Sequence, residues 1–355
     1  MKEKKLSALL LAVVMIFSLA ACGSKTPKTD PNATRIFTDS TGREVEVPAQ
    51  IDKVALSGPL AQIVLFALCP DKLVGVSNAW SSEAQEFLDE KYFNMPQIGQ
   101  LYGGKGELNL ETLLQSGAQV VIDVGESKGS IKEDMNSLQQ QTGIPFVHIS
   151  ADMQSYPQAY RMLGDLLGMK TEAEALATYC EKIYSRTETI ASGVEKANVL
   201  YVTGDMGQNV IAKGSYHAEI LDMLTNNLAQ VDEPSSKGTG NEVSMEQILT
   251  WNPDVVIFAP ESIYATVKDD AAWQSVTAIK NGAYYEVPFG PYNWMGFPPS
   301  VQRYLGMVWL SKLLYPDATA DYDLFADVQE YYKLFYHCDI TRAQYDALVA
   351  NSIGK

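Results

Sequence analysis

The sequence predicts an α/β protein of two lobes joined by a helical connector. β-favouring runs alternate with helical runs in both halves, one strand-free helical segment separates the halves, and the second half repeats part of the first. Regular alternation of strands and helices is typical of a parallel sheet covered by helices. The length of 355 residues agrees with this division, because a domain usually contains roughly 100–200 residues.

The N-terminal lobe is expected over residues 35–154. Two β-favouring runs on either side of a glycine turn, over residues 36–48, predict a hairpin that Pro48 closes. Further strands are expected at 53–56, 73–76, 120–123 and 145–149. Apolar residues at helical spacing over 61–68 predict a helix after the first of these strands.

Residues 155–194 are the expected connector, because helix formers dominate there and no proline follows Pro157. Gly164 and Gly168 indicate that this segment begins as a shorter packing helix. The C-terminal lobe is expected over 195–355. Residues 109–122 align with 244–257 at a constant offset of 135, including a shared Val-Val-Ile run, which indicates a duplicated lobe rather than a solenoid of many repeats.

The first 22 residues have the features of a lipoprotein signal peptide. Three lysines near the start precede an uncharged run over residues 6–21, which is short for a bilayer span. The run ends in Leu-Ala-Ala-Cys-Gly, which resembles the bacterial lipobox, so lipidation is expected at Cys22. Residues 23–34, rich in Ser, Thr, Pro and Lys, are expected to form a flexible tether. A buried hairpin or a stop-transfer anchor is the alternative interpretation of the apolar run.

The charge argues against a polyanionic partner. The full chain carries 43 acidic and 27 basic residues, and loss of the signal peptide removes three lysines and one glutamate, which changes the net charge from −16 to −18. Nucleic-acid binding needs a dense basic face, so no nucleic-acid partner is expected. The function is expected outside the cytoplasmic membrane. Cys69, Cys180 and Cys338 have no metal-site or redox spacing and are expected to be small buried residues.

Several separated motifs together resemble one family. They are the lipobox, the Thr-Asp-Ser-Thr-Gly-Arg-Glu-Val-Glu-Val-Pro opening at 38–48, Asp-Lys-Leu-Val-Gly-Val-Ser at 71–77, Asn-Leu-Glu at 109–111, and the Pro-Pro-Ser and Leu-Gly-Met segments at 298–307. The chain from about Arg35 to Pro316 thereby resembles the substrate-binding lipoproteins of ABC transporters for iron–siderophore, haem and cobalamin uptake. These are class III, or helical-backbone, periplasmic binding proteins.

The resemblance implies two Rossmann-like lobes joined by a single long rigid helix, with a ligand cleft between the lobes. It implies a binding protein, not an enzyme, that captures an iron chelate or cobalamin outside the cell and delivers it to a membrane permease. A molybdate- or tungstate-binding protein of the same family is the alternative. A surface metal-cofactor carrier or a lipoprotein enzyme is the alternative from a different class. A monomer attached to the membrane by its lipid is expected.

The candidate ligand site lies on the loops that follow the strands, since ligands of open α/β sheets bind beyond the carboxyl ends of the strands. These loops are rich in aromatic residues, which offer large contact area and a polar tip. The cluster between Pro291 and Pro298 either faces a ligand or closes an edge of the core. The expected ligand-binding residues are Trp80, Tyr102, Tyr216, His217, Tyr264, Tyr292, Asn293, Trp294, Phe297 and Arg303.

A resident cofactor or catalytic centre is not expected. No hydrolase, P-loop or histidine metal motif occurs in the sequence. His148 lies in an apolar strand run and is expected in the core, as are Trp251 and Trp273, whereas His217 is the one histidine with a possible role as a metal ligand. Few basic residues lie on the candidate loops, which favours a weakly charged metal chelate over a triply anionic catecholate complex.

Two acids are expected to contact the permease. The family resemblance implies one acidic residue on each lobe that pairs with permease arginines, and by position these are Glu133 and Glu261. The alternative for each is an ordinary solvated surface acid.

Overall fold

The N-terminal lobe is built on a three-stranded parallel sheet with the order β3-β4-β5. The computed structural model describes residues 33–102 and 107–353. The strands are Val54–Leu56, Val120–Gly125 and Phe146–Ser150, and β4 is buried along its whole length. A strand covered on both faces has no need of polar residues, which explains the apolar run over residues 120–122 with which β4 begins, before Asp123. The predicted parallel sheet is confirmed.

The hairpin predicted at the start of this lobe is also present. Strands β1 (Thr34–Thr38) and β2 (Glu44–Pro48) pair in antiparallel register. The predicted strand at 73–76 is wrong: Leu73 and Val76 make only isolated bridges, to Val54 and Gln97. This segment pairs with two different neighbours at its two ends and so never runs alongside one strand.

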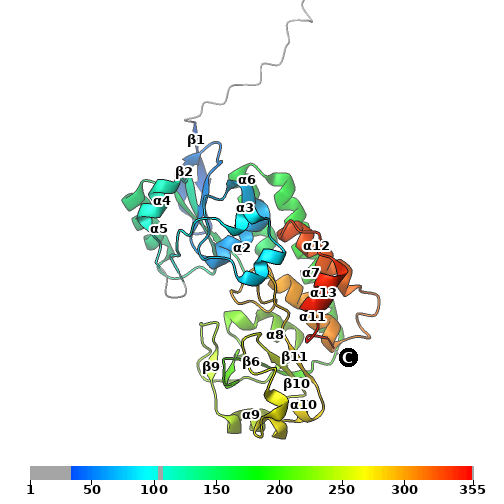
Figure 1. Ribbon diagram of the computed structural model, residues 1–355. Helices are drawn as coiled ribbons and strands as arrows, with labels where there is room; N and C mark the ends of the chain where they lie inside the picture. The colour runs from blue at the N-terminus through cyan, green and yellow to red at the C-terminus, as the bar shows by residue number, and fades with distance from the viewer. Residues whose placement is uncertain (1–32, 103–106, 354–355) are drawn as a thin grey trace, which may run out of the picture.

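Helices cover both faces of the small sheet, as Figure 1 shows. Asn109 caps α4 by accepting a hydrogen bond from the backbone of Thr112, and Gly117 ends this helix in the left-handed conformation. The helices of this lobe are α2 (Pro59–Leu68), α3 (Glu90–Phe93), α4 (Leu110–Ser116) and α5 (Ile131–Thr142), with the 3₁₀ turns η1 (Pro70–Lys72) and η2 (Ser82–Glu86).

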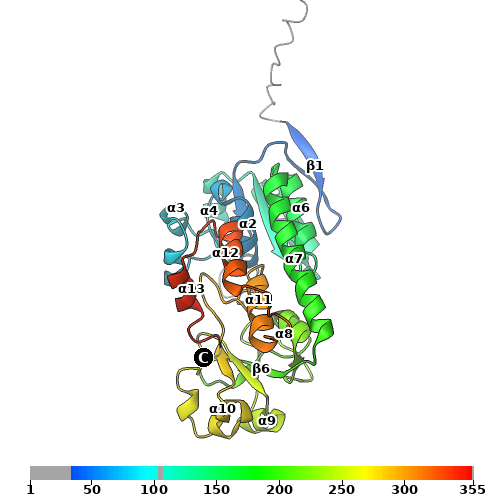
Figure 2. The same ribbon diagram turned by 90° about the vertical axis from the view of Figure 1, so that its right-hand side faces the viewer.

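The connector consists of two antiparallel helices. Helix α6 (Tyr156–Leu167) packs along the N-terminal lobe and ends at Gly168, and α7 (Lys170–Gly193) follows after a tight turn. A side chain at Gly164 would meet Ala173 at 2.5 Å, so this glycine allows the two helices to approach closely. Helix α7 has 24 residues and spans about 36 Å at roughly 1.5 Å per residue. Figure 2 shows it running from one lobe to the other.

The C-terminal lobe is built on a mixed sheet with the order β11-β10-β6-β7-β9, and β8 pairs with β6. Its central strands β6, β10 and β11 are parallel, and β7 and β9 are short antiparallel additions. The strands are β6 (Asn198–Thr203), β7 (Asn209–Val210), β8 (Asn226–Asn227), β9 (Asn241–Glu242), β10 (Val255–Phe258) and β11 (Tyr284–Glu286).

The internal repeat corresponds to one helix–strand unit in each lobe. In α9 (Met245–Trp251) the Ser244 side chain accepts a hydrogen bond from the backbone of Gln247, as Asn109 does in α4. Asn252 ends α9 in the left-handed conformation that Gly117 adopts after α4. The remaining short helical elements of this lobe are η3 (Tyr216–Ala218), α8 (Glu219–Leu224), η4 (Val267–Asp269), η5 (Trp273–Ser275) and α10 (Thr277–Lys280).

The last helices of the chain return to the N-terminal lobe. Helix α11 (Arg303–Leu314) packs on α7, and α12 (Leu324–Phe335) contacts both α7 and α2. The rings of Phe87 and Tyr332 lie 5.2 Å apart, and Gln344 in α13 (Arg342–Leu348) donates a hydrogen bond to the backbone of Glu86. The expected range of the C-terminal lobe therefore contains helices that pack against the N-terminal lobe. One apolar core extends from both lobes through α7.

Candidate ligand-binding cleft

The two lobes touch where their strand ends face each other. Tyr216, in η3 of the C-terminal lobe, donates its hydroxyl proton to the carbonyl oxygen of Ala151 at 3.0 Å, directly after β5. The predicted site residue Tyr216 therefore lies between the lobes. The side chains around this contact come from both lobes and form the walls of the candidate cleft.

Arg303 lies buried behind the C-terminal wall of the cleft. Its side chain is 0% exposed, its Nη1 donates to the carbonyl of Tyr216 at 2.9 Å, and its guanidinium lies 4.8 Å from the centre of the Tyr216 ring. The same Nη1 lies 2.5 Å from Glu219 Oε2, in an ion pair that is not aligned as a hydrogen bond. Burial raises the pKa of Glu219 in spite of this pairing. Arg303 Nε and Nη2 have no hydrogen-bond partner among the described residues.

His217 and Phe297 extend the same wall. His217 Nδ1 lies 3.4 Å from the carbonyl oxygen of Gly296, and burial lowers the pKa of this histidine. A side chain at Gly238 would collide with the Phe297 ring at 2.2 Å and approach His217 at 3.2 Å, so Gly238 leaves room for both. The Phe297 side chain is 47% exposed, which agrees with a position at the rim of a cleft.

The N-terminal wall contains a chain of hydrogen-bonded side chains at the ends of β4 and β5. His148 Nδ1 lies 2.7 Å from Asp123 Oδ2, and His148 Nε2 lies 2.9 Å from Ser127 Oγ and 3.2 Å from Ser150 Oγ. Asp123 Oδ1 also accepts a hydrogen bond from Ser57 Oγ. His148 is fully buried, as predicted. Its link to two accessible serines was not predicted.

A second contact between the lobes involves the aromatic residues Trp80 and Tyr292. Their rings lie 5.8 Å apart, and Gln62 of α2 donates a hydrogen bond to Tyr292 Oη at 3.1 Å. The indole N–H of Trp80 donates to the carbonyl of Tyr92, and Trp80 is 7% exposed. The structure therefore brings Trp80 and Tyr292 together across the lobes, with Trp80 mostly in the core.

Asn293 and Trp294 lie in the interior rather than on the surface of the cleft. Trp294 is 0% exposed and belongs to the main core, and Asn293 is 1% exposed. The Asn293 amide donates to Tyr201 Oη and accepts a hydrogen bond from the backbone of Met295, so it fixes the turn. The alternative that this cluster closes an edge of the core describes these two residues. Their burial does not support the assignment of these two residues to the ligand.

Tyr102 lies beside the N-terminal wall, whereas Tyr264 lies apart from the contact between the lobes. Tyr102 donates a hydrogen bond to Asp134 of α5, and the Lys128 ammonium lies 4.5 Å from the centre of its ring. Tyr264 packs beside Tyr284 in the separate apolar cluster of the C-terminal lobe, where Trp273 is buried and Trp251 is partly buried. The placement therefore does not support Tyr264 as part of a shared ligand site, whereas Tyr102 stays a candidate beside the N-terminal wall.

The two candidate docking acids are both exposed. Glu133 lies in the first turn of α5, and Glu261 lies shortly after β10. The cysteines are free thiols: Cys69 and Cys180 are buried, and Cys338 is partly buried. Burial raises the pKa of Cys69 to about 12, so this thiol is unreactive at neutral pH. Cys22 lies outside the described residues.

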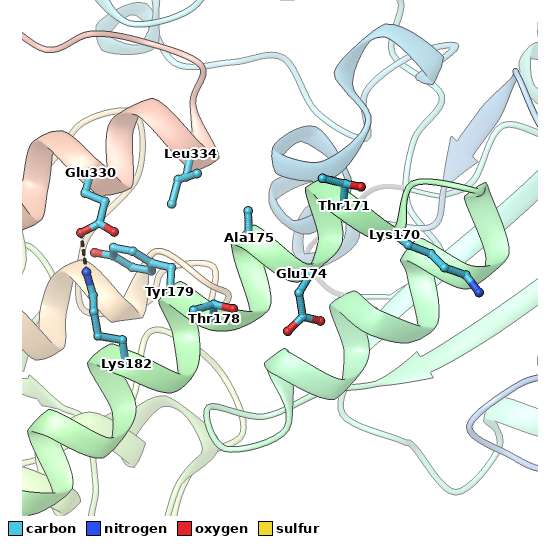
Figure 3. Close-up of a pocket in the computed structure, with 9 residues that line it drawn as sticks. All are labelled: Lys170, Thr171, Glu174, Ala175, Thr178, Tyr179, Lys182, Glu330 and Leu334. Atoms are coloured by element: carbon cyan, nitrogen blue, oxygen red, sulfur yellow. Dashed lines mark hydrogen bonds and ion pairs between the residues drawn. The ribbon is translucent and has the colours of Figure 1, made fainter.

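Hollows among the described residues lie elsewhere on the molecule. Figure 3 shows an open groove of about 680 Å³ between α7 and α12, where Lys182 pairs with Glu330 across the groove and Tyr179 lies beside them. A smaller hollow of about 270 Å³ is lined by residues of both lobes and of α13. Its charged side chains are the acids Glu83, Glu86 and Glu286, which repel anions.

A protein-built metal site was not found in the part of the chain that the structure describes. No three His, Cys, Asp or Glu side chains of the described residues are grouped so that they could hold an ion. Likewise, no described helix is long and apolar enough to cross a membrane. The described groups of the cleft can instead bind a solute through hydrogen bonds, from hydroxyls of both lobes, an imidazole and a buried guanidinium.

Comparison with known proteins agrees with the two-lobe fold. Over 348 residues the chain is 24% identical to the molybdate-binding protein MolA of Haemophilus influenzae, covering 90% of this chain and 95% of MolA. A structure of MolA bound to molybdate superposes with a TM-score of 0.70 at 21% identity, covering 86% of this chain and 99% of that one.

Two more solved structures have the same architecture. An ABC transporter solute-binding protein from Sulfurospirillum deleyianum has a TM-score of 0.81 at 26% identity, and covers 89% of this chain and 99% of its own. The catecholate-siderophore-binding protein VctP of Vibrio cholerae has a TM-score of 0.54 at 17% identity, and covers 72% of this chain and 91% of its own.

The family itself is identified by a profile described as periplasmic binding protein, which matches residues 54–290. This match extends from the first strand of the N-terminal sheet to beyond the last strand of the C-terminal one, so it includes both lobes and the connector. The chain belongs to the periplasmic binding protein family, as an extracytoplasmic solute-binding component of an ABC transporter and not an enzyme.

Proposed function

We propose that the solute is a small tetrahedral oxyanion of the molybdate or tungstate type, bound between the lobes beside Tyr216. The observation that carries this proposal is the fully buried Arg303, which leaves Nε and Nη2 without a partner among the described residues, next to the contact between the lobes. Unpaired buried N–H groups are costly, and an anion is the partner that they bind most strongly.

The hydrogen-bond donors of the cleft suit such an anion. Hydroxyls of Ser127 and Ser150 lie on the N-terminal wall, and the hydroxyl of Tyr216 and the imidazole of His217 lie on the C-terminal wall. An oxyanion offers only acceptor oxygens, so it satisfies donors from two sides at once. The full-length similarity to a molybdate-binding protein supports the same class of solute.

The direct contact between the lobes favours a small solute. The Tyr216 hydroxyl bonds to Ala151 at 3.0 Å, and Ser300 Oγ donates to the carbonyl of Leu60 at 3.3 Å. A bulky chelate must break such contacts to enter, whereas a tetrahedral anion needs only a small space. The expected iron chelate or cobalamin is therefore the second candidate. Its support is the aromatic set of Trp80, Tyr292 and Phe297, which could stack on a chelate.

Calorimetry on the purified mature protein tests the solute. Molybdate and tungstate should each bind and raise the melting temperature, and sulfate and phosphate should bind more weakly. At a concentration a hundred times its Kd, a ligand stabilises the folded state by about 2.7 kcal/mol. A ferric hydroxamate siderophore, haem and cobalamin form the second set of titrations. Binding of one of these without binding of molybdate or tungstate would contradict the oxyanion proposal and support the chelate.

We also propose that the mature protein is a monomer tethered to the membrane through a lipid on Cys22. Replacement of Cys22 by serine should release the protein from the membrane fraction while leaving solute binding by the purified chain unchanged. Retention of the Cys22→Ser protein on membranes would contradict the anchor.

We propose in addition that Glu133 and Glu261 pair with basic residues of the permease. The pair of variants Glu133→Gln and Glu261→Gln should reduce uptake in cells without changing solute affinity. Exposed Glu188 of α7 offers a matched control. Equal uptake by the docking variants and by Glu188→Gln would contradict the docking role.

A further inference from the structure

We propose that Ser127 and Ser150 bind the oxygen atoms of the solute, and that the buried His148 behind them takes up one proton when the solute binds. This inference rests on the proposed oxyanion function and adds the N-terminal half of the site and its pH dependence. The observation behind it is the continuous hydrogen-bonded chain from Ser57 through Asp123 and His148 to the two serines.

The position of the two serines suits contact with a solute. Ser127 follows β4 and is exposed, and Ser150 ends β5 and is partly exposed. Ser150 directly precedes Ala151, whose carbonyl oxygen receives the Tyr216 hydroxyl from the other lobe. The serines therefore lie on the N-terminal wall opposite Tyr216 and His217.

When His148 is neutral, the hydroxyl protons of Ser127 and Ser150 are both used within the cluster, and neither is left for a solute. The Asp123 carboxylate can only accept, so Nδ1 of the ring carries its proton toward Asp123 and Nε2 is an acceptor. One serine then donates to Nε2. The serine oxygens lie 2.5 Å apart, so the other serine donates to the first. Both hydroxyl protons are used within the cluster.

Protonation of Nε2 reverses these roles. The ring now donates to a serine oxygen, which releases one hydroxyl proton for an oxyanion. Both hydroxyls donate to it once the serine oxygens, 2.5 Å apart in this conformation, move apart. The proton comes from solvent and stays on His148, so the Asp123–His148 pair changes from net negative to neutral and repels the bound anion less, without any change in covalent bonding. This change of charge matters because the buried Arg303 of the opposite lobe is already paired with Glu219. A histidine is suited to this task near neutral pH.

Charged groups lie around His148. Asp123 contacts the ring directly, and the Asp39 carboxylate accepts a hydrogen bond from the backbone N–H of His148 while it pairs with Arg43. Other titratable or charged groups of the neighbouring loops and of α5, which packs on β5, include Tyr102, Glu126, Lys128, Lys132, Glu133 and Asp134.

Calorimetric titration of the mature protein with sodium molybdate tests the inference. Titrations in two buffers of different ionisation enthalpy count the protons taken up, and a series from about pH 6 to pH 8.5 covers the histidine range. Affinity of the unchanged protein should fall with rising pH, by up to about tenfold per pH unit. The double variant Ser127→Ala/Ser150→Ala should lose at least about tenfold in affinity, together with the proton uptake.

Three controls separate this role from a general effect on the fold. Ser130→Ala alters an exposed serine on the same loop, whose hydroxyl bonds to Asp134, and should bind like the unchanged protein. His148→Gln should bind weakly with no pH dependence, whereas His217→Gln should keep the pH dependence. Since His148→Gln can also disturb folding, the serine double variant decides the outcome.

The outcomes distinguish the inference from the function on which it rests. If the unchanged protein binds molybdate and the serine double variant binds it equally well with the same proton uptake, the serine–histidine role is overturned and the oxyanion function stands. If the unchanged protein binds neither molybdate nor tungstate, both are overturned.

Discussion

Arg186 of the connecting helix α7 and Asp327 of α12 form an ion pair with two contacts, of 3.1 and 2.6 Å. Both side chains are mostly buried, with 19% and 12% of their surface exposed, and the Arg186 guanidinium also lies over the ring of Tyr322. The pair holds α12 against α7, the helix that joins the lobes.

Loss of this pair should destabilise the protein. Asp327→Ala leaves the Arg186 charge poorly compensated, and the free energy of unfolding should fall by about 2–4 kcal/mol in urea. Arg161→Ala is the matched control on α6, because Arg161 forms ion pairs with Glu174 and Glu181 at a more exposed position. It should cost no more than about 1 kcal/mol. Equal losses in the two variants would contradict the role of the buried pair.

Tyr216→Phe should loosen the contact between the lobes. The variant keeps the ring that lies against Arg303 and loses the hydrogen bond to Ala151, which is worth about 1 kcal/mol. Amide hydrogen exchange should become faster in residues 150–155 and 215–219 of the solute-free protein. Tyr264→Phe, on a tyrosine away from this contact, serves as control and should leave exchange in both segments unchanged.

Arg303→Met should cost both stability and solute affinity. The variant leaves the Glu219 carboxylate partly buried without its cation, which should lower the free energy of unfolding by about 3 kcal/mol. Adding Glu219→Gln should restore part of that stability but not the affinity, because the donors toward the solute remain absent. Restoration of affinity in the double variant would show that Arg303 acts only by neutralising Glu219.

Trp294→Ala should act on the fold. The side chain is 0% exposed in the main core, so its truncation should cost about 3–5 kcal/mol of unfolding free energy. Phe297→Ala, at the exposed rim, should have a much smaller effect on stability. Urea unfolding of the two variants checks this difference, and a stable Trp294→Ala protein with weakened binding would return Trp294 to the ligand.

Asp39 should contribute to stability at neutral pH and lose this contribution in acid. Burial alone raises its pKa, but hydrogen bonds from Thr41, Arg43 and His148 outweigh burial and hold the pKa below the ordinary value of 3.8. A lowered folded-state pKa stabilises the fold above the unfolded value and loses that effect as pH falls through the folded value. Asp39→Asn should therefore be less stable than the unchanged protein at pH 7, with the difference shrinking below about pH 4. A constant difference would contradict this assignment.

Local features of the chain were predictable, because they depend on neighbouring residues. Asn109 and Ser244 stand at equivalent positions of the repeat, and both cap the helix that follows. Gly164 and Gly168 correctly indicated the short packing helix before the long connector. The exception is the segment at 73–76, where β propensity could not show that its two ends pair with different partners.

The candidate site was less predictable, because it depends on contacts between distant residues. Tyr292 and Trp294 are two positions apart in an irregular segment, where no periodicity tells which side chain turns inward. His148 lies 25 residues from Asp123 and 21 from Ser127, and the parallel pairing of β4 and β5 is what brings them together. An apolar run around His148 indicated its burial but carried no sign of its partners.

The return of the last helices to the N-terminal lobe has a mechanical consequence. In the described part of the chain the backbone leaves the N-terminal lobe through α7, returns to it between α11 and α12, and leaves again before Asn351, which bonds to Glu286 of β11. Figure 2 shows these passages side by side. Several parallel chain segments between two lobes resist twisting more than a single helix does, so the lobes have little freedom to swing apart. We therefore expect a solute bound between the lobes to change the stiffness of the protein more than the relative positions of the lobes.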